Sequence, residues 1–530
     1  MIHSFQTELR ESWQSFRSYL GQSKGLCWFT GLTILFLYGI RLTQGDLFVD
    51  SDIMLTAPEG LMFSWYGHQR FGLIVTKKLF SLMRLLPFQA NALFFLTLYL
   101  LVLGICFCFF RWSGGAEPYR KGAFLFAGMF LSAPCFAEQF NFVLQAFESA
   151  AAMVFCVMAA YCSGRWIYEK KSILWAIPAI GFMTWAFGSY QAYPAFYIAI
   201  VLISYVTVFI HHKEACGLRE GLAQAGLFLA GFFSSRLCSR LLCELQGASS
   251  GYVDSMFWWG VKDLEVCLTS IREDMFRIYR GTWPLFFIRW FLPASLTASA
   301  LALFLGWKRR SRMFPCLLLA LVLLWISPML ITLITAMPQP IRGQMTYPLI
   351  YGWYVMFLYT AFASLPAIRP NARFLKKAAC TAVTAAGMVL GWKQGISMSQ
   401  LWETAHEQYV SDTLTANRMY LDVCHAADRS DMENCRVVFV GTRAAGLGGT
   451  PLFGDVIGHS FFEWDASGPI GVSGRVNTFF KTLGLYMAVP TEEDYQEALS
   501  TCEDRPPWPA SDSVFLLTPD VVVVKLSNVE

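Results

Sequence analysis

The stretch Ala92–Phe110, with the sequence ALFFLTLYLLVLGICFCFF, is apolar along its whole length and carries no charge. A helix of this length spans about 30 Å, which is the thickness of the hydrocarbon core of a bilayer. The whole 530-residue chain has the same character, because 55% of its residues are hydrophobic and only 15% are charged. A soluble protein has about a quarter of its residues charged. The sequence therefore predicts an integral membrane protein that crosses the bilayer several times.

Other apolar windows lie on both sides of this stretch. Windows of about 17 to 25 residues predict about eleven membrane helices, assembled as a bundle. The first window shows no small-residue cleavage site after it and is expected to remain as an anchor. The windows lie near residues 26–42, 90–110, 122–137, 143–163, 173–187, 191–210, 222–243, 286–306, 314–336, 348–366 and 376–393.

Basic residues follow every second predicted helix, on the same side as the N-terminus. Cytoplasmic flanks of membrane helices collect Lys and Arg. The N-terminus is therefore predicted to be cytoplasmic, and the alternate loops, including 43–89 and 246–284, are predicted to face the outside. The basic residues are Arg111, Arg120, Lys121, Arg165, Lys170, Lys171, Lys213, Arg219, Lys308, Arg309, Arg310, Arg312, Arg369, Arg373, Lys376 and Lys377.

The first outside loop contains an amphipathic stretch, residues 71–86, in which Lys77, Lys78 and Arg84 interrupt apolar residues at helical spacing. Such a helix is expected to lie in the plane of the membrane interface. In the second outside loop, Trp258, Trp259 and Trp283 are side chains typical of the headgroup layer.

From about residue 394 the composition becomes that of a soluble protein. Residues 397–427 predict an amphipathic helix, and 436–440 and 521–526 predict β-strands. We therefore predict a transmembrane domain over 1–393 and a small extracytoplasmic α/β domain over 394–530. Two of the cysteines Cys424, Cys435 and Cys502 could form a disulfide there, and the sequence does not select the pair.

The segment GDLFVDSD, residues 45–52, follows the first predicted membrane helix and contains Asp46, Asp50 and Asp52. Carboxylates this close repel one another, which raises the pKa of at least one of them and makes it a candidate base. The alternative is an acidic loop that is simply solvated, since a perturbed acid is only a probabilistic marker of function.

Four further motifs accompany this segment: WYGHQRFG at 65–72, QFNF at 139–142, SYQA at 189–192 and QPIRG at 339–343. Together they resemble the Gtr type II family of bacterial membrane glucosyltransferases over most of the membrane part. The resemblance implies a helical GT-C-like fold and a transferase that works on the outer face with a polyprenyl-phosphate sugar as donor.

The resemblance also implies roles for individual residues. Inverting transfer requires a carboxylate to take the acceptor proton, and cations to hold the departing phosphate. We expect Asp52 to be the base and Asp50 to orient the acceptor or a metal ion, and which of the two is the base stays open. Arg70 and Arg342 are expected to hold the lipid phosphate, although Arg342 could equally stabilise a loop. The expected substrate-binding residues are Trp65, Arg70, Glu138, Gln139, Tyr190, Gln191 and Arg342.

The predicted function is transfer of a hexose, expected to be glucose, to a cell-surface glycan such as O-antigen or a wall polymer. Its expected partners are the lipid-linked donor, the glycan acceptor, the bilayer, and an upstream flippase and donor-lipid synthase; no nucleic acid is expected. No Cys or His spacing indicates a metal site, and the sequence indicates no particular cofactor. Because carboxylates could serve as base or as ligand, a divalent cation stays open. The alternatives are a lipid-sugar flippase or transporter, and a glycan polymerase or ligase.

Overall fold

A computed structural model describes the protein over residues 2–80, 85–212, 216–249, 251–282, 285, 289–308, 313–366 and 370–529. Arg84, Lys213, Trp283, Arg309, Arg310, Arg312 and Arg369 lie outside these residues. The chain divides into two compact units, which we name the helical unit and the C-terminal unit. The helical unit comprises Met1–Thr43, Met62–Phe140 and Gln145–Ser399, and the C-terminal unit comprises Gln44–Leu61, Asn141–Leu144 and Gln400–Glu530.

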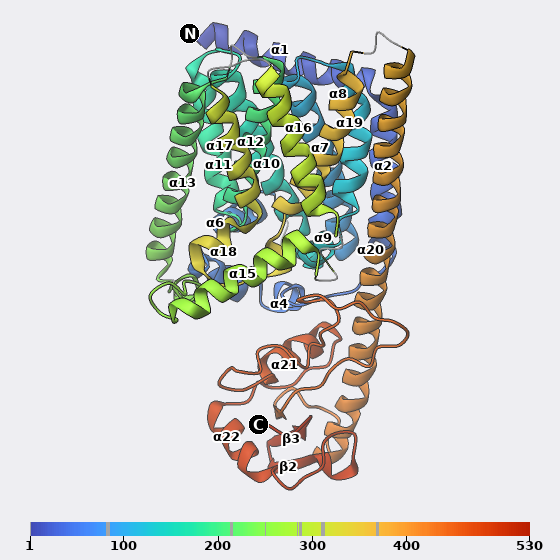
Figure 1. Ribbon diagram of the computed structural model, residues 1–530. Helices are drawn as coiled ribbons and strands as arrows, with labels where there is room; N and C mark the ends of the chain where they lie inside the picture. Colours follow the sequence, from blue (N-terminus) through green and yellow to red (C-terminus); the bar gives the residue numbers. More distant parts are fainter. Residues whose placement is uncertain are drawn as a thin grey trace. The chain divides into compact units, whose positions relative to one another are not determined.

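A helix lies in each of the eleven predicted windows (Figure 1). By length and composition, seven helical stretches of the described chain could cross a membrane, and the number eleven stays a prediction. The helices are α2 (Lys24–Tyr38), α7 (Pro87–Trp112), α8 (Glu117–Leu131), α10 (Ala146–Ile167), α11 (Ala176–Phe187), α12 (Tyr193–His211), α13 (Leu218–Gln246), α16 (Phe291–Lys308), α17 (Phe314–Ile326) with α18 (Leu330–Thr335), α19 (Thr346–Ser364) and α20 (Pro370–Ala427).

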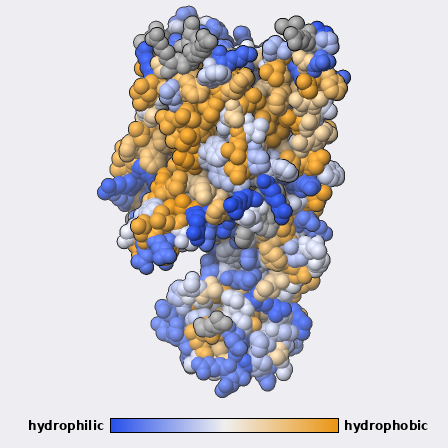
Figure 2. All heavy atoms as spheres, in the orientation of Figure 1, coloured by the Kyte–Doolittle hydropathy of each residue, from blue (hydrophilic) through white to orange (hydrophobic). Residues whose placement is uncertain are grey.

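The helical unit carries apolar side chains on its outer surface as well as in its core. Figure 2 shows apolar residues gathered over the middle of this unit, with hydrophilic residues towards its two ends. Large side chains such as Trp28, Phe36 and Phe233 are between 64% and 74% exposed. A surface of this kind is stable in lipid and would be costly in water, so the fold is that of a membrane protein.

Short helices connect the long ones. Lys77, on α6 (Phe71–Phe80), is buried and forms an ion pair of 2.7 Å with Glu148 of α10. The charge of Lys77 is therefore internal, because a cation in an apolar environment is stable only beside a counter-charge, and the interfacial position of residues 71–86 stays a prediction. The remaining helices of the chain up to residue 343 include α1 (Ile2–Gln22), α4 (Ser51–Thr56), α5 (Pro58–Gly67), α9 (Cys135–Phe140), α14 (Gly251–Ser255), α15 (Leu264–Arg280) and the short 3₁₀ helix η7 (Ile341–Gly343).

The C-terminal unit contains a three-stranded sheet in the order β1-β3-β2. The predicted strands are confirmed as β1 (Arg436–Val440) and β3 (Val521–Lys525), which pair in parallel, and β2 (Val514–Thr518), which was not predicted, pairs antiparallel to β3. Two helices accompany the sheet, α21 (Ser473–Thr482) and α22 (Glu492–Thr501). Val49 lies in the apolar core of this unit, which explains why the segment 44–61 belongs to it.

Two further findings concern this part of the chain. The predicted membrane helix 376–393 and the predicted amphipathic helix 397–427 are one continuous helix, α20. No proline interrupts the sequence between them, so the backbone hydrogen bonds continue where the composition changes. Cys424, Cys435 and Cys502 are all free thiols, as are the other cysteines.

Candidate functional site

The acidic segment is organised by a short helix of the C-terminal unit. Asp50 is the N-cap residue of α4 and has a left-handed backbone conformation with φ of 70°, and Asp52 lies in the first turn. The Asp52 side chain is completely buried, whereas that of Asp50 is 27% exposed. The two carboxyl groups therefore differ in access although only one residue separates them.

An arginine from a distant part of the sequence lies among these carboxylates. Arg475 belongs to α21, which packs against α4, and its Nη1 atom lies 3.1 and 3.3 Å from the two carboxylate oxygens of Asp52. Its Nη2 atom lies 3.6 Å from Asp50 Oδ1, and its Nε atom donates to Asp465 Oδ2 at 2.9 Å. One buried guanidinium thus contacts three carboxylates, and we name Asp50, Asp52, Asp465 and Arg475 the acidic cluster.

Neighbouring contacts fix the position of Arg475. Ser473, two residues earlier, accepts a hydrogen bond of 2.9 Å from the backbone N–H of Phe439 in β1. Asn477, two residues later, donates to the carbonyl oxygen of Met487 at 2.9 Å. Because both residues are buried and bonded to the backbone, α21 holds Arg475 in one orientation towards α4.

Burial sets the protonation of the acidic cluster. Removal from water raises the pKa of Asp52 from 3.8 to about 6, against the opposing effect of Arg475, and the charge of Asp50 raises it further. Burial lowers the pKa of the Arg475 guanidinium, but the charges of Asp52, Asp465 and Asp50 outweigh this effect and raise the pKa above its usual value, so the guanidinium stays protonated.

A second group of predicted residues lies in the helical unit. Arg70 donates to Gln191 Oε1 at 3.4 Å and lies over the ring of Tyr190, with 4.9 Å from its Cζ atom to the ring centre. Gln191 in turn donates to the carbonyl oxygen of His68 at 2.6 Å. The structure therefore brings together Arg70, Tyr190 and Gln191, which come from two separate motifs.

The remaining predicted residues are also in the helical unit. Glu138 is completely buried on α9, and its neighbour Gln139 donates to Ser149 Oγ at 2.7 Å. Arg342 lies on η7, which packs against α9. Trp65 is a buried core residue of α5. Glu138 and Arg342 are thus on neighbouring elements, although their motifs are far apart in the sequence.

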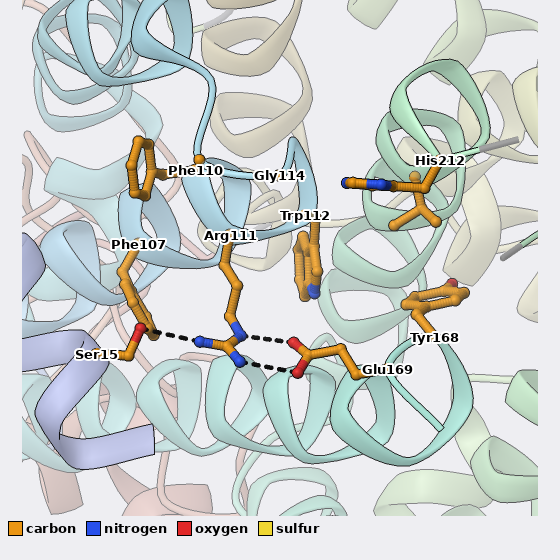
Figure 3. Close-up of a pocket in the computed structure, with 11 residues that line it drawn as sticks. Ser15, Phe107, Phe110, Arg111, Trp112, Gly114, Tyr168, Glu169 and His212 are labelled. Carbon is orange, nitrogen blue, oxygen red and sulfur yellow. Dashed lines mark hydrogen bonds and ion pairs between the residues drawn. The ribbon is translucent and has the colours of Figure 1, made fainter. Parts of the chain in front are cut away.

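The helical unit also contains a pocket with a volume of about 440 Å³, in which an ion pair lies among mainly apolar side chains (Figure 3). In it, the Arg111 guanidinium donates to both carboxylate oxygens of Glu169, at 2.5 and 2.8 Å, and to Ser15 Oγ at 2.9 Å. Figure 3 shows the ring of Trp112 above the Glu169 carboxylate, with His212 and Tyr168 farther from Arg111. Arg111 is therefore paired with a carboxylate, which Arg165 contacts as well.

Sequence reasoning missed Arg475. This residue follows Asp52 by 423 positions and has no motif around it that marks a site. A single arginine in a soluble segment does not indicate a functional site by its sequence alone. Only the packing of α21 against α4 identifies Arg475 as part of the acidic cluster. Over the described parts of the chain, no group of three or more His, Cys, Asp and Glu side chains is arranged to hold a metal ion.

Comparison with known proteins gives one match. The family model described as glucosyl transferase GtrII matches residues 39–360, which is more than half of the chain and includes Asp50, Asp52 and Arg70. The match ends before Arg475. No curated protein matches the chain. No solved structure matches it either. This match agrees with the membrane-length helices of the chain and with the motifs described above. The chain therefore belongs to the GtrII glucosyltransferase family.

Proposed function

We propose that the protein transfers a hexose, expected to be glucose, from a polyprenyl-phosphate donor to an extracytoplasmic glycan, with inversion at the anomeric carbon. The observation that carries this proposal is the acidic cluster, whose Asp50 and Asp52 lie inside the residues matched by the glucosyltransferase family. The acceptor would be a cell-surface polymer such as O-antigen or a wall polymer.

The proposed reaction is a single displacement at the anomeric carbon of the donor sugar. The acceptor hydroxyl loses its proton to a carboxylate, and its oxygen forms a bond to the anomeric carbon from the face opposite the phosphate. The bond between that carbon and the phosphate oxygen breaks, and polyprenyl phosphate leaves with the electron pair. A positioned base contributes about 10²- to 10⁴-fold to such a step.

The difference in exposure between the two aspartates supports a division of their roles. Asp50 has solvent access at its carboxylate, which a base needs in order to meet the acceptor hydroxyl. Both oxygens of Asp52 already contact Arg475. We therefore assign Asp50 as the base, and Asp52 as the residue that positions Arg475. The sequence had favoured the opposite choice, with Asp52 as the base.

The topology belongs to the same proposal. The basic flanks of alternate helices support a cytoplasmic N-terminus, and the C-terminal unit, which contains the acidic cluster, would then be extracytoplasmic. Donor lipid would reach this side through an upstream synthase and flippase. Residues 1–393 would form the transmembrane part of the transferase, and 394–530 its soluble cap.

The proposal is tested with purified protein in lipid nanodiscs, a polyprenyl-phosphate glucose donor and glycan from a strain that lacks the gene. Asp50→Asn should reduce transfer by about 10²- to 10⁴-fold while the protein still inserts in the membrane. Asp520→Asn, which alters an exposed ion pair with Arg429 outside the acidic cluster, serves as the matched control. Full activity of Asp50→Asn would refute the assignment of the base.

The donor class is tested separately, because a polymerase or ligase would use a diphosphate-linked oligosaccharide. Transfer from the monophosphate donor and not from the diphosphate donor is expected. In addition, mass spectrometry of surface glycans should show the loss of one hexose per repeat when the gene is deleted. Unchanged glycans together with lipid-sugar flipping in liposomes would favour a transporter instead.

A further inference from the structure

A second cavity of the helical unit, with a volume of about 860 Å³, lies beside the N-terminal helix α1, and we name it the α1 cavity. Its lining comes from residues 5–16 of α1, 100–108 of α7, 154–162 of α10, and 174–182 of η3 (Ile173–Trp175) and α11. No charged side chain is among the described residues that line it, and nearly all of them are apolar. Buried water needs about two to four polar partners, whereas an apolar cavity of about 150 Å³ can stay dry and bind apolar molecules. The lining therefore favours hydrocarbon over water.

The way α1 rests on the other helices explains the cavity. Figure 1 shows α1 running across the ends of the long helices. The ring of Phe5 lies 5.1 Å from that of Trp175, and the ring of Phe16 lies 5.2 Å from that of Phe107, measured between ring centres. Phe16 follows Phe5 by eleven positions, which is about 16 Å along a helix. Between these two contacts α1 bridges the space that forms the cavity.

The cavity opens towards the surroundings of the helical unit. Trp13 of α1 and Ile177 of α11 line it and are 66% and 68% exposed, and Leu100 of α7 is also exposed. Gly104 of α7 lies in its wall without a side chain, and a Cβ atom there would meet Val157 at 3.6 Å, an ordinary contact distance. Exposed apolar side chains on three helices are stable against lipid chains and costly in water, so the opening faces hydrocarbon.

The acidic residues of α1 attach the helix to the rest of the unit. The Glu8 carboxylate accepts a hydrogen bond of 2.8 Å from Trp175 Nε1. Glu11 Oε2 lies 3.6 Å from Lys171 Nζ and 3.8 Å from Arg165 Nη2. Both negative charges of α1 are therefore directed towards the helices beneath it.

The basic residues of α1 lie on another side of the helix. Arg10 and Arg17 are exposed, and among the described residues no carboxylate forms an ion pair with either of them. Trp13 follows Arg10 by three positions and precedes Arg17 by four, and residues at these spacings are neighbours on the surface of a helix. Because Trp13 lines the cavity, two uncompensated cations lie beside its edge.

We propose that the α1 cavity binds one acyl chain of an anionic bilayer phospholipid, whose phosphate group contacts Arg10 and Arg17. Guanidinium groups bind phosphate oxygens well, and the apolar lining accepts the chain. An amphipathic helix with aromatic residues on one face and basic residues beside them is typical of a helix that lies in the interface of an anionic leaflet. The lipid fills the space beneath α1 and keeps the helix in its position.

This site differs from the site of the proposed transfer reaction. None of its lining residues belongs to the motifs that resemble the glucosyltransferase family, and all of them lie in the helical unit, away from the acidic cluster of the C-terminal unit. The ligand is therefore a component of the bilayer and not the sugar donor.

The headgroup is tested by native mass spectrometry of the purified full-length protein with phosphatidylglycerol. One tightly bound lipid is expected, and phosphatidylcholine with the same chains should bind at least about tenfold more weakly. Arg10→Gln and Arg17→Gln should each weaken binding of phosphatidylglycerol about fivefold. Lys121→Gln removes an exposed cation of α8 that already lies 3.8 Å from Glu117, and should bind as the wild type does. Equal binding of the two lipids, or wild-type binding by both arginine variants, would overturn the headgroup assignment.

The chain is tested by filling the cavity. Gly104→Leu places a side chain in the wall and should weaken binding at least about tenfold, because buried methylene groups of the lipid are displaced. Gly226→Leu adds the same volume on α13, where a Cβ atom meets nothing within 4 Å, and should bind normally. Thermal melting verifies that each variant is folded. With the wild type, dihexanoyl phosphatidylglycerol should bind more weakly than the dioleoyl lipid, and equal binding would show that no chain enters the cavity.

Two other occupants of the cavity give different results. If farnesyl phosphate displaces phosphatidylglycerol at equal concentration, the cavity belongs to the donor lipid and the inference fails. If the protein without lipid forms a dimer that Gly104→Leu abolishes, a second copy of the chain covers the cavity, and the inference fails as well. Hexose transfer is not the readout of any of these measurements, so their outcome is independent of the proposed function.

Discussion

The contact between Asp52 and Arg475 should be measurable as an energetic coupling. A shift of one pKa unit corresponds to about 1.4 kcal/mol of free energy. The rise in the pKa of Asp52 from 3.8 to about 6 therefore means that ionised Asp52 lowers the free energy of unfolding by about 3 kcal/mol at pH 8. Asp52→Asn removes this cost and also removes one partner of Arg475, which keeps Asp465 at 2.9 Å. We therefore expect Asp52→Asn to change stability by no more than about 1 to 2 kcal/mol.

Arg475→Gln should behave differently, because it leaves a buried carboxylate without its cation. Removal of one partner of a buried pair costs about 3 to 5 kcal/mol. The double variant, Asp52→Asn with Arg475→Gln, contains neither charge and should be more stable than Arg475→Gln alone by at least about 2 kcal/mol. Adding Asp52→Asn is thus expected to restore part of the stability that Arg475→Gln loses.

The loss of stability in Arg475→Gln should depend on pH, with a sign that follows from the raised pKa. Without the cation, the folded pKa of Asp52 lies above about 6, whereas the unfolded value stays near 3.8. The folded state then holds a proton that the unfolded chain has already released, so stability falls as pH rises through the folded pKa. The destabilisation should therefore be larger at pH 8 than at pH 6.

The assay follows opening of the C-terminal unit within the full-length protein. Cys435 and Cys502 are buried thiols of this unit, so their rate of labelling, read by mass spectrometry, reports its unfolding. Arg429→Gln, which breaks an exposed ion pair with Asp520, is the control and should cost less than about 1 kcal/mol. A double variant that is no more stable than Arg475→Gln would refute the reasoning.

Three further predictions follow from single contacts. Transfer activity should fall as pH decreases through about 6, since protonation of Asp52 weakens its hold on Arg475; a pH–rate profile that is flat from pH 7.5 to about 5 would contradict this. Lys77→Met should destabilise the helical unit by about 3 to 5 kcal/mol by leaving Glu148 unpaired, and adding Glu148→Leu should recover most of the loss in detergent melting temperature. Burial raises the pKa of Asp412 to about 7, and its carboxylate accepts hydrogen bonds from the Ser460 hydroxyl and the N–H of Phe461. Asp412→Ala removes both bonds and should raise the rate of protease cleavage in the 441–472 loop. Unchanged cleavage would show that these two bonds do not stabilise the loop.

The sequence alone determined the class of the protein and most of its elements. Helix formation depends on local hydrogen bonds and on uninterrupted apolar length, so windows such as Ala92–Phe110 locate helices without any knowledge of their neighbours. Strands were predicted over 436–440 and 521–526 on equally local grounds, because runs of valine favour an extended backbone, and β1 and β3 confirm them. The family motifs likewise lie in short continuous segments, and the family match confirms that resemblance.

Only the tertiary structure decided which charges meet. Arg475 reaches Asp52 across 423 residues, and Lys77 reaches Glu148 across 71, and no local pattern announces either contact. The energy of a charge depends on its burial and on its neighbours, so the sequence could predict which residue types are present but not which of them are paired.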